Sequence, residues 1–595
     1  MSKQTETKKI KTEWDLSLLY ESINDPQIEK DIVLAERIYS NFEKKYKKTT
    51  DYTKSTRALL GALEDYEKLA GFPSWKAYSY LHKMQDLDAS NQEVRAKIST
   101  LLQRLSKLGN KIIFFDVTIS KIPQMSQKKF LNDKKLVKYK YFLKKVFEHG
   151  AHVLTEPEEK ILSLKSLPAH SLWTDSLKKV RERLMVKYKG KTIPLSEVSA
   201  TIPELSAQKD RVALHTQMME QYKSIADVAE SELNAIVIDK KIDDELRGYQ
   251  KPYDATIMGY ENNRKGVLNL IQTVTDNFHV AHRFYKVKAK MLGLSELYYA
   301  DRAAKVGSTK KKFSFDDSYQ ILLNIFGSLD TEFANILKKF VENGQIDAFP
   351  KQGKVGGAYC SSMHQLPTYV LLNHADNLDS LSTFAHEMGH AIHSEFSRTQ
   401  PVLYEDYSMS TAETASTLFE SFVFYDQFEK LSDQEKIIAL HDKIQDDIQT
   451  IFRQVACFNF ENEMHETIRA KGSMTKEEFA ELMNKHMASY LGPIMKMREI
   501  DGYFFIGWPH IRNFFYVYSY AFGQLTSKVL HKKYIQDKTY IEKIKKFLSL
   551  GGSMSPEDIF KSIGVDLTHP NFFKDGISTI EDDIKMLEKL VKMNV

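Results

Sequence analysis

The sequence predicts a mainly α-helical protein with a small amount of β-sheet. Apolar residues recur at intervals of three and four over most of the chain, which is the spacing of one helix face. Only 25 Gly and 15 Pro occur in 595 residues, so few positions interrupt this pattern. Strand-like patterns are confined to two short stretches. A chain of this length is expected to bury a large core or to divide into several lobes.

The clearest predicted helix follows the polar residues 90–91, which suit a helix start. The buried face of this helix would consist of Val94, Ile98, Leu101, Leu105, Leu108 and Ile112. A second start is predicted at Asp25–Pro26, because proline fits the first turn of a helix. A third is predicted at Thr155–Glu158, which has the spacing of a capping box.

The two strand-like stretches divide the predicted architecture. Met185–Ile193, centred on Gly190, predicts a hairpin. The stretch from Gly353 to Asn373 predicts a small sheet, with a strand at Tyr369–Leu372. We take the hairpin as the boundary between two domains. The predicted parts are a flexible tail over residues 1–12, an N-terminal helical domain over 13–195, and a domain over 196–595 that carries the motif described next.

Composition excludes several classes of protein. The 84 basic and 79 acidic residues leave a formal charge of +5, which gives no reason to expect a nucleic-acid partner. Two cysteines, Cys360 and Cys457, cannot form a disulfide framework and are expected to be buried, inert thiols. Residues 1–14 are polar, and no apolar run of about 18 residues occurs. We therefore expect a soluble cytoplasmic protein with no membrane partner.

The strongest chemical signal is the motif His386-Glu-Met-Gly-His390 on a predicted helix. Residues four apart share a helix face, so both imidazoles can bind one Zn²⁺ ion. Glu387 lies about 100° around the helix and can act as a general base on water without binding the metal. Two histidines and one carboxylate leave a position open for that water. The alternative is a surface helix with two solvated histidines.

The third ligand must come from another part of the chain. His393 follows the second histidine by three residues, whereas a third histidine in zinc peptidases follows it by six. Glu413, near the start of the next predicted helix, is the better candidate. It also matches a capping box with Ser410, so spacing alone leaves ligand and cap equally open. Glu420 is a possible partner for a ligand histidine, or a surface carboxylate.

A late aromatic segment, Pro509–Gly523, contains the remaining candidates. Tyr516 and Tyr520 are four residues apart and would share a helix face, while Tyr518 would point away. His510 lies shortly before them. For an arbitrary cluster of tyrosines, an aromatic core stripe is the commoner explanation.

These segments resemble oligoendopeptidase F, a branch of the thimet-oligopeptidase-like metallopeptidases. The resemblance rests on the helix His386–His393, on Thr411-Ala-Glu413-Thr-Ala-Ser-Thr, and on Gly353-Lys-Val-Gly-Gly-Ala-Tyr. The opening Trp14-Asp-Leu-Ser-Leu-Leu-Tyr20 is also similar, so the resemblance covers nearly the whole chain. It is densest from Gly353 to about Gly523.

The resemblance implies a two-lobed, zincin-type metallopeptidase with a small sheet beside the active-site helix and a deep substrate channel. It implies that Glu413 completes a site for one Zn²⁺ per chain, and that His510 and Tyr520 stabilise the oxyanion of the tetrahedral intermediate. Tyr516 is a further candidate for this role. The implied function is endopeptidase cleavage of internal bonds in short unfolded peptides, with Glu387 as general base, for peptide turnover in the cytoplasm.

Three further expectations concern substrate and alternatives. The strand containing Tyr369, Val370 and Leu371 is expected to bind substrate by strand addition, which favours broad selectivity. A carboxypeptidase of similar fold is the nearest alternative, with Arg512 as the group that would hold a terminal carboxylate. A non-enzymatic helical interaction protein is the other alternative. The sequence does not indicate an oligomeric state.

Overall fold

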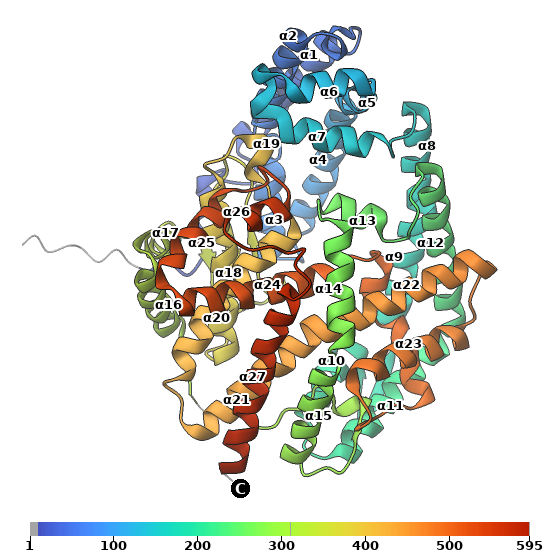
Figure 1. Ribbon diagram of the computed structural model, residues 1–595, viewed down its shortest axis with the longest axis vertical. Coiled ribbons are helices and arrows are strands. Elements are labelled where there is room, and N and C mark those ends of the chain that lie inside the picture. Colours follow the sequence, from blue (N-terminus) through green and yellow to red (C-terminus); the bar gives the residue numbers. More distant parts are fainter. Residues whose placement is uncertain (1–9, 310, 594–595) are drawn as a thin grey trace, which may run out of the picture. The chain divides into compact units, whose positions relative to one another are not determined.

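The protein is mainly helical with small sheets, as predicted (Figure 1). The computed structural model describes residues 10–309 and 311–593. The chain forms two compact units, each built from three segments distant in sequence. Unit 1 comprises Met1–Glu156, Lys311–Asp426 and Lys533–Ile563, and unit 2 comprises Pro157–Lys310, Gln427–Lys532 and Gly564–Val595. These units follow packing rather than sequence position, so the domain boundary at residue 195 stays a prediction.

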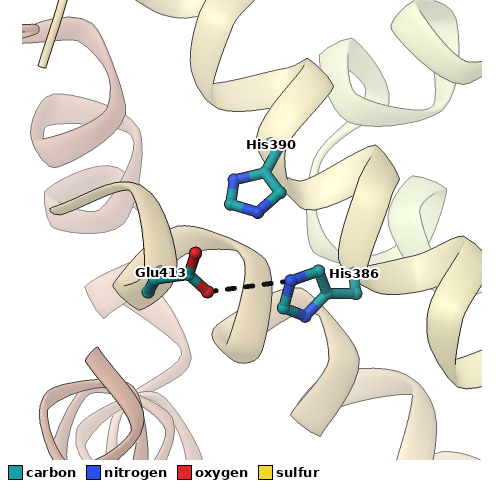
Figure 2. A group of neighbouring side chains, drawn as sticks. All are labelled: His386, His390 and Glu413. Carbon is teal, nitrogen blue, oxygen red and sulfur yellow. Dashed lines mark ion pairs between the residues drawn. The ribbon is translucent and has the colours of Figure 1, made fainter. Parts of the chain in front are cut away.

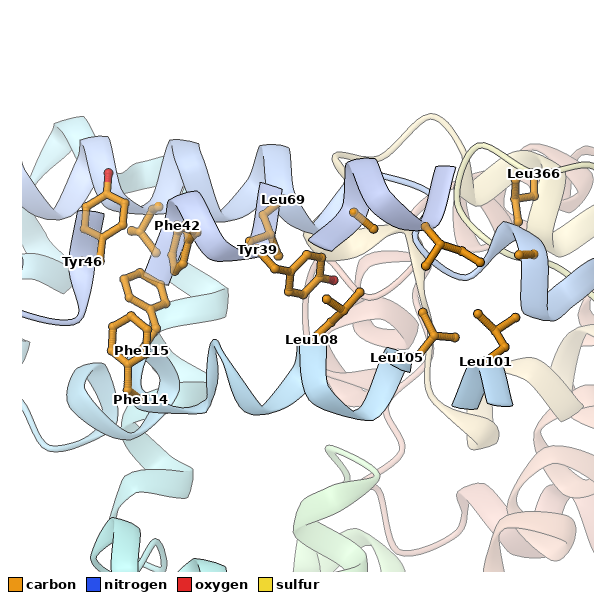
Figure 3. Packing of buried hydrophobic residues seen from close by; sticks show 14 of the residues in the cluster. Tyr39, Phe42, Tyr46, Leu69, Leu101, Leu105, Leu108, Phe114, Phe115 and Leu366 are labelled. Carbon is orange, nitrogen blue, oxygen red and sulfur yellow. The ribbon is translucent and has the colours of Figure 1, made fainter. Parts of the chain in front are cut away.

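Unit 1 contains helices from all three of its segments. They are α1 Pro26–Tyr46, α2 Thr56–Ala70, α3 Lys76–Leu87, α4 Gln92–Asn110, α5 Ile113–Ser120, α6 Gln124–Asn132, α7 Lys140–Gly150, α16 Phe315–Leu329, α17 Thr331–Glu342, α18 Leu378–Ser397, α19 Val402–Glu405, α20 Met409–Phe428, α25 Ile541–Ser549 and α26 Pro556–Ser562. Figure 3 shows part of the core, where α1 side chains such as Phe42 pack against Phe115 of α5 and leucines of α4.

Two predicted helix starts of unit 1 are confirmed, because their caps are present. The side chain of Asp25 accepts a hydrogen bond from the backbone N–H of Gln27 at the start of α1. Asn91 accepts one from Val94 at the start of α4. The periodic residues of α4 from Val94 to Leu108 are buried, as their spacing predicts.

A three-stranded sheet in unit 1 has the order β4-β6-β5, with β4 Ile346–Asp347, β5 Tyr359–Ser361 and β6 Tyr369–Leu371. β4 is parallel to β6, and β5 is antiparallel to it. The predicted sheet is confirmed, but its order corrects one prediction. β6 has a partner on each side and its three residues are fully buried, so Tyr369, Val370 and Leu371 cannot add a substrate strand. β5 is an edge strand.

The N-terminal part of the chain is tied to this sheet. The indole N–H of Trp14 donates to the backbone oxygen of Val370, 2.8 Å away. Of the predicted tail, residues 1–9 lie outside the described residues. Lys11 and Thr12 are hydrogen-bonded to the backbone of Val341 and Ala348, so these two positions belong to the folded unit.

Unit 2 contains the remaining α-helices and two small pairs of strands. They are α8 Glu156–Ser166, α9 Leu172–Glu182, β1 Met185–Tyr188, β2 Lys191–Pro194, α10 Leu195–Thr201, α11 Gln208–Ser224, α12 Ala226–Arg247, α13 Asp254–Gly259, α14 Arg264–Asp276, α15 His279–Met291, β3 Leu297–Tyr298, α21 Asp433–Asp447, α22 Arg453–Lys471, α23 Lys476–Leu491, β7 Met495–Lys496, α24 Tyr518–Gln536 and α27 Phe572–Met593. The predicted hairpin is β1-β2, closed by Lys189 and Gly190 at φ 47° and 77°.

Candidate metal centre

Helix α18 carries two histidines on one face, as predicted. Its N-cap is Asn377, whose side chain accepts a hydrogen bond from the backbone of Ser380. The apolar residues Leu381, Ala385, Met388 and Ile392 are fully buried and fix the helix against the core of unit 1. The rings of His386 and His390 lie on the other side, one turn apart, with centroids 4.9 Å from each other.

Glu413 of α20 completes a three-residue group with these histidines (Figure 2). One ligand atom from each residue lies within 4.8 Å of the other two, and His386 Nε2 is 3.8 Å from Glu413 Oε2. Tetrahedral zinc with bonds of about 2.0–2.1 Å sets its ligand atoms about 3.4 Å apart. The three side chains therefore need only small movements to hold one zinc ion, and their donor set suits it.

The helix-cap interpretation of Glu413 is wrong. The backbone oxygen of Ser408 accepts from the N–H of Ala412, so Ser408 is the residue that precedes the helix. Ser410 lies inside α20, and Glu413 is its fifth residue. A capping box requires the acidic residue at the third position. Glu413 thus has no capping role to explain its place beside the histidines.

Gly389, between the two histidines, allows α20 to approach α18 closely. A Cβ atom built at this position would lie 2.7 Å from the Cα of Ser416 and 3.2 Å from Cβ of Phe419. Real Cβ atoms do not approach backbone this closely, so any larger residue would push the two helices apart. The helix contact that brings Glu413 to the histidines thus depends on a glycine within the motif.

We expect Gly389→Ala to lower the free energy of unfolding of the metal-free protein by about 1–3 kcal/mol, the usual cost of overpacking. Because the displaced helix carries Glu413, zinc affinity should fall as well. Urea unfolding with a chelator and competitive zinc titration measure the two effects. Gly61→Ala is the matched control, since that helical glycine has nothing within 4 Å of the added Cβ. Wild-type zinc affinity in Gly389→Ala would contradict the role assigned to this contact.

The charges around the histidines favour metal binding. Burial acts to lower the pKa of His386, but the carboxylates of Glu420, Glu387 and Glu413 raise it to about 9. Burial and the neighbouring imidazoles hold the pKa of His390 well below its usual value, so this ring is neutral. Burial raises the pKa of Glu413. Three carboxylates thus lie close to the two imidazoles, and a cation bound there would interact favourably with them.

Glu387 is buried on the side of α18 that faces strand β5. Burial raises the pKa of its carboxyl group to about 7, and a hydrogen bond from the backbone N–H of Cys360 acts in the opposite direction. That N–H belongs to the middle residue of β5, so the outer edge of the sheet faces this carboxylate. A carboxylate with a pKa near neutrality is well matched to accept and return a proton.

Two neighbouring residues behave as their positions predict. Glu420 Oε2 lies 3.3 Å from His386 Nδ1, the ring nitrogen that faces away from Glu413. His393 is buried and its ring stacks on Tyr407 at a centroid distance of 3.6 Å. Its ligand atoms are not part of the metal-binding group. Cys360 and Cys457 are both unpaired.

His510, Tyr516 and Tyr520 lie together in unit 2, whereas the metal-binding group lies in unit 1. Their three rings are mutual neighbours, with centroids 5.5 to 6.0 Å apart, and the Nδ1 atom of His510 is hydrogen-bonded to the Tyr516 hydroxyl. Burial lowers the pKa of His510 to about 4, so the ring is neutral. Tyr518 is fully buried, and its hydroxyl accepts a hydrogen bond from the Asn262 side chain at 3.0 Å.

The prediction that Tyr516 and Tyr520 share a helix is wrong, because α24 begins only at Tyr518. Before it, Phe514 and Phe515 have φ angles of 45° and 62°, a conformation that costs non-glycine residues energy. The buried carboxylate of Glu461 accepts from the backbone N–H of Phe515 at 2.7 Å. Thr256 donates to the Phe514 backbone oxygen. Sequence reasoning missed these residues, since no local pattern marks them.

Arg512, the candidate for holding a substrate carboxylate, is unsuited to that role. Its guanidinium forms a two-bond ion pair with Glu232 at 2.9 and 3.0 Å. It also donates to the backbone oxygens of Phe505 and Trp508, and the residue is buried. An arginine with these partners inside a core is a structural residue.

Two family models and several curated relatives match this chain. A family model described as peptidase family M3 matches residues 204–579, and one described as oligopeptidase F matches residues 119–176. The chain is 28% identical to an oligoendopeptidase F homolog from Borreliella burgdorferi, over 97% of this chain and 98% of that protein. It is 24% identical to oligopeptidase PepF from Bacillus subtilis, over 87% of this chain and 78% of that protein.

Solved structures share the fold. A protein from Chlamydophila abortus superposes with a TM-score of 0.82 at 22% identity, covering 97% of this chain and 98% of the other. Oligoendopeptidase-F from Enterococcus faecium superposes with a TM-score of 0.71 at 20% identity, covering 95% and 99%. Within residues 10–309 and 311–593, no helix has the length and apolar character needed to cross a bilayer.

Proposed function

This chain belongs to peptidase family M3, and on that premise we propose that it is a zinc-dependent endopeptidase that cleaves internal bonds of short unfolded peptides. The observation that carries the proposal is the meeting of His386, His390 and Glu413 beside the buried carboxylate of Glu387. Two imidazoles and one carboxylate are the ligand set of a catalytic zinc site. The proposed location is the cytoplasm, which suits a chain with two unpaired cysteines.

Each residue near the metal has a proposed role. When bound, zinc would act as a Lewis acid, making water more acidic and the scissile carbonyl more electrophilic. Glu387 would take a proton from the attacking water at its carboxylate oxygen and pass it to the leaving amine. Glu420 would orient the His386 ring through its Nδ1 atom. The pKa of His390 lies well below its usual value, so this ring is neutral and can bind the metal without first losing a proton.

The proposed oxyanion donors are His510, Tyr520 and Tyr516. Their side chains are half-buried, and thus have surface left for a ligand. Phenol hydroxyls and a neutral imidazole N–H can donate to the negative oxygen of the tetrahedral intermediate, and one lost donor typically costs about 10²–10³ in rate.

Strand β5 is the proposed place for the substrate backbone. Its outer edge faces Glu387, and an extended peptide added there would bring a backbone carbonyl toward the metal ligands. Main-chain hydrogen bonds accept many sequences, which supports broad selectivity. This assignment replaces the one based on β6.

The products of one unstructured peptide of about ten residues distinguish an endopeptidase from a carboxypeptidase. We expect mass spectrometry to detect pairs of internal fragments whose masses sum to that of the peptide plus water. A chelator should abolish the fragments, and added zinc should restore them. Stepwise loss of single C-terminal residues would favour the carboxypeptidase instead, although Arg512 is already engaged by Glu232. Cleavage that resists the chelator would remove the metal from the proposal.

A further inference from the structure

Unit 2 contains a second polar cluster, distinct from the residues discussed so far, in which hydrogen-bond donors outnumber acceptors. Four elements and one residue that follows one of them contribute to it. Its members are Tyr285 of α15, Tyr299 of the short helix Tyr299–Asp301, Arg302 directly after that helix, Arg453 at the start of α22, and Tyr490 of α23. Electrostatic interactions link Tyr490 to the other four, so the side chains share one neighbourhood.

The arginines of this cluster stack on aromatic rings. The guanidinium carbon of Arg302 lies 4.4 Å from the ring centre of Tyr299, and that of Arg453 lies 4.5 Å from the ring centre of Trp508. Phe504 lies between them, 5.6 and 5.3 Å from the two guanidinium carbons. Stacking occupies the flat faces of a guanidinium and leaves its N–H groups, which lie in the plane, free to donate.

These donors have no acceptor. The hydroxyls of Tyr285, Tyr299 and Tyr490 and the Nε atoms of both arginines are buried without a hydrogen-bond partner among the described residues. All three tyrosines are fully buried. The hydroxyls of Tyr285 and Tyr490 face each other, but a bond between them would satisfy only one donor of the five. Buried polar groups in proteins are nearly always paired, so these five donors call for an acceptor that the neighbouring side chains do not supply.

Two carboxylates of this region are already engaged by other arginines. The carboxylate of Asp301 forms an ion pair with Arg211 at 2.7 Å, and the carboxylate of Asp501 forms one with Arg498 at 2.8 Å. In the part of the chain that the structure describes, neither Arg302 nor Arg453 has an ion-pair partner. The buried Lys288 nearby donates to the Arg302 backbone oxygen, and its pKa is lowered to about 7, chiefly by burial. Water can accept hydrogen bonds here but cannot balance the charge of two guanidinium groups.

We propose that Arg302, Arg453 and the hydroxyls of Tyr285, Tyr299 and Tyr490 form a binding site for a small monovalent anion, either a halide ion or a carboxylate group. Every group of the site can donate a hydrogen bond and two carry positive charge, which suits an anion and disfavours a metal ion. Arg453 follows directly on the π-helical segment Ile448–Phe452, an irregularity that often marks functional positions. Arg453 also acts on His510, whose pKa it lowers together with burial. An anion bound beside Arg453 would oppose this effect.

The test uses the zinc-loaded full chain and its thermal unfolding midpoint. Sodium chloride, bromide or acetate is titrated at constant ionic strength, with the bulky anion isethionate making up the balance. We expect a saturable rise in the midpoint with at least one small anion, because a ligand that binds only the folded state stabilises it. Tyr490→Phe removes one oxygen and Arg453→Gln one charge. Each should raise the half-saturating concentration at least tenfold.

The control and the second measurement separate the outcomes. Arg283→Gln removes an arginine of unit 2 that is paired with Glu588, and should leave the anion response unchanged. Anomalous scattering from wild-type crystals soaked in bromide should place a peak beside Arg453 Nε if the ion is a halide. A response to acetate alone, with a higher KM for peptides whose C-terminus is amidated, assigns the site to a substrate carboxylate. A midpoint that stays constant as each small anion replaces isethionate would overturn the proposal, as would variants that respond like the wild type.

Discussion

A Glu387→Gln variant is expected to keep one zinc ion per chain and to lose nearly all peptide hydrolysis. The side-chain oxygen that glutamine retains can still accept the hydrogen bond from the Cys360 backbone, so the fold around the motif should be preserved. An amide cannot take a proton from water at neutral pH. Loss of a general base typically costs about 10²–10⁴ in rate. Steady-state peptide cleavage and atomic absorption measure the two quantities.

The matched control is Glu395→Gln, on the same helix two turns later. Glu395 pairs with Arg398 and accepts from the Thr368 hydroxyl, so it has structural partners and no proposed role in proton transfer. Its variant should turn over peptide within a few-fold of the wild type. Turnover by Glu387→Gln at the control's rate would remove Glu387 from the mechanism. Loss of zinc from Glu387→Gln would instead indicate a ligand.

Local periodicity accounts for the part of the site that the sequence predicted. His386 and His390 share a helix face because they are four residues apart, and the buried stripe of α18 fixes which face is turned to the core. Both facts are contained within a few turns of one helix. Spacing alone left Glu413 equally open as a ligand or a cap, and the resemblance favoured the ligand. In the structure the residue that precedes the helix is Ser408, which rules out the capping role of Glu413. Sequence patterns place helix ends only to within one or two residues, so they could not distinguish Ser408 from Ser410 as the cap.

The incorrect predictions concern long-range partners. Strand β6 is central because β4, only two residues long, pairs with it, and so short a strand has no recognisable period. Arg512 is structural because Glu232 lies on a distant helix. The backbone before Tyr516 takes a strained path that Glu461 stabilises from α22. In each case the deciding contact joins residues far apart in sequence, so only the folded structure reveals it.

Replacing Glu413 with alanine is expected to lower zinc affinity by more than about 100-fold, since even partners of the ligand residues contribute 10–100-fold. Zinc content after dialysis should fall well below one per chain, and peptide cleavage should fall with it. The metal-free protein should be no less stable than the wild type. Burial raises the pKa of Glu413, because desolvation disfavours its charged form. Desolvating this carboxylate therefore opposes folding, and alanine removes that penalty.

Urea unfolding of the metal-free variant, combined with zinc titration, makes this outcome specific. A capping residue would give the opposite pair of results, a loss of about 1 kcal/mol in stability with zinc retained. Glu420→Gln supplies the graded comparison. It keeps an oxygen near His386 Nδ1 but removes the charge, so its zinc affinity should fall by about 10–100-fold while one ion per chain still binds at saturation. If Glu413→Ala bound zinc as tightly as Glu420→Gln does, the carboxylate on α20 would not be a ligand, and another residue would have to complete the site.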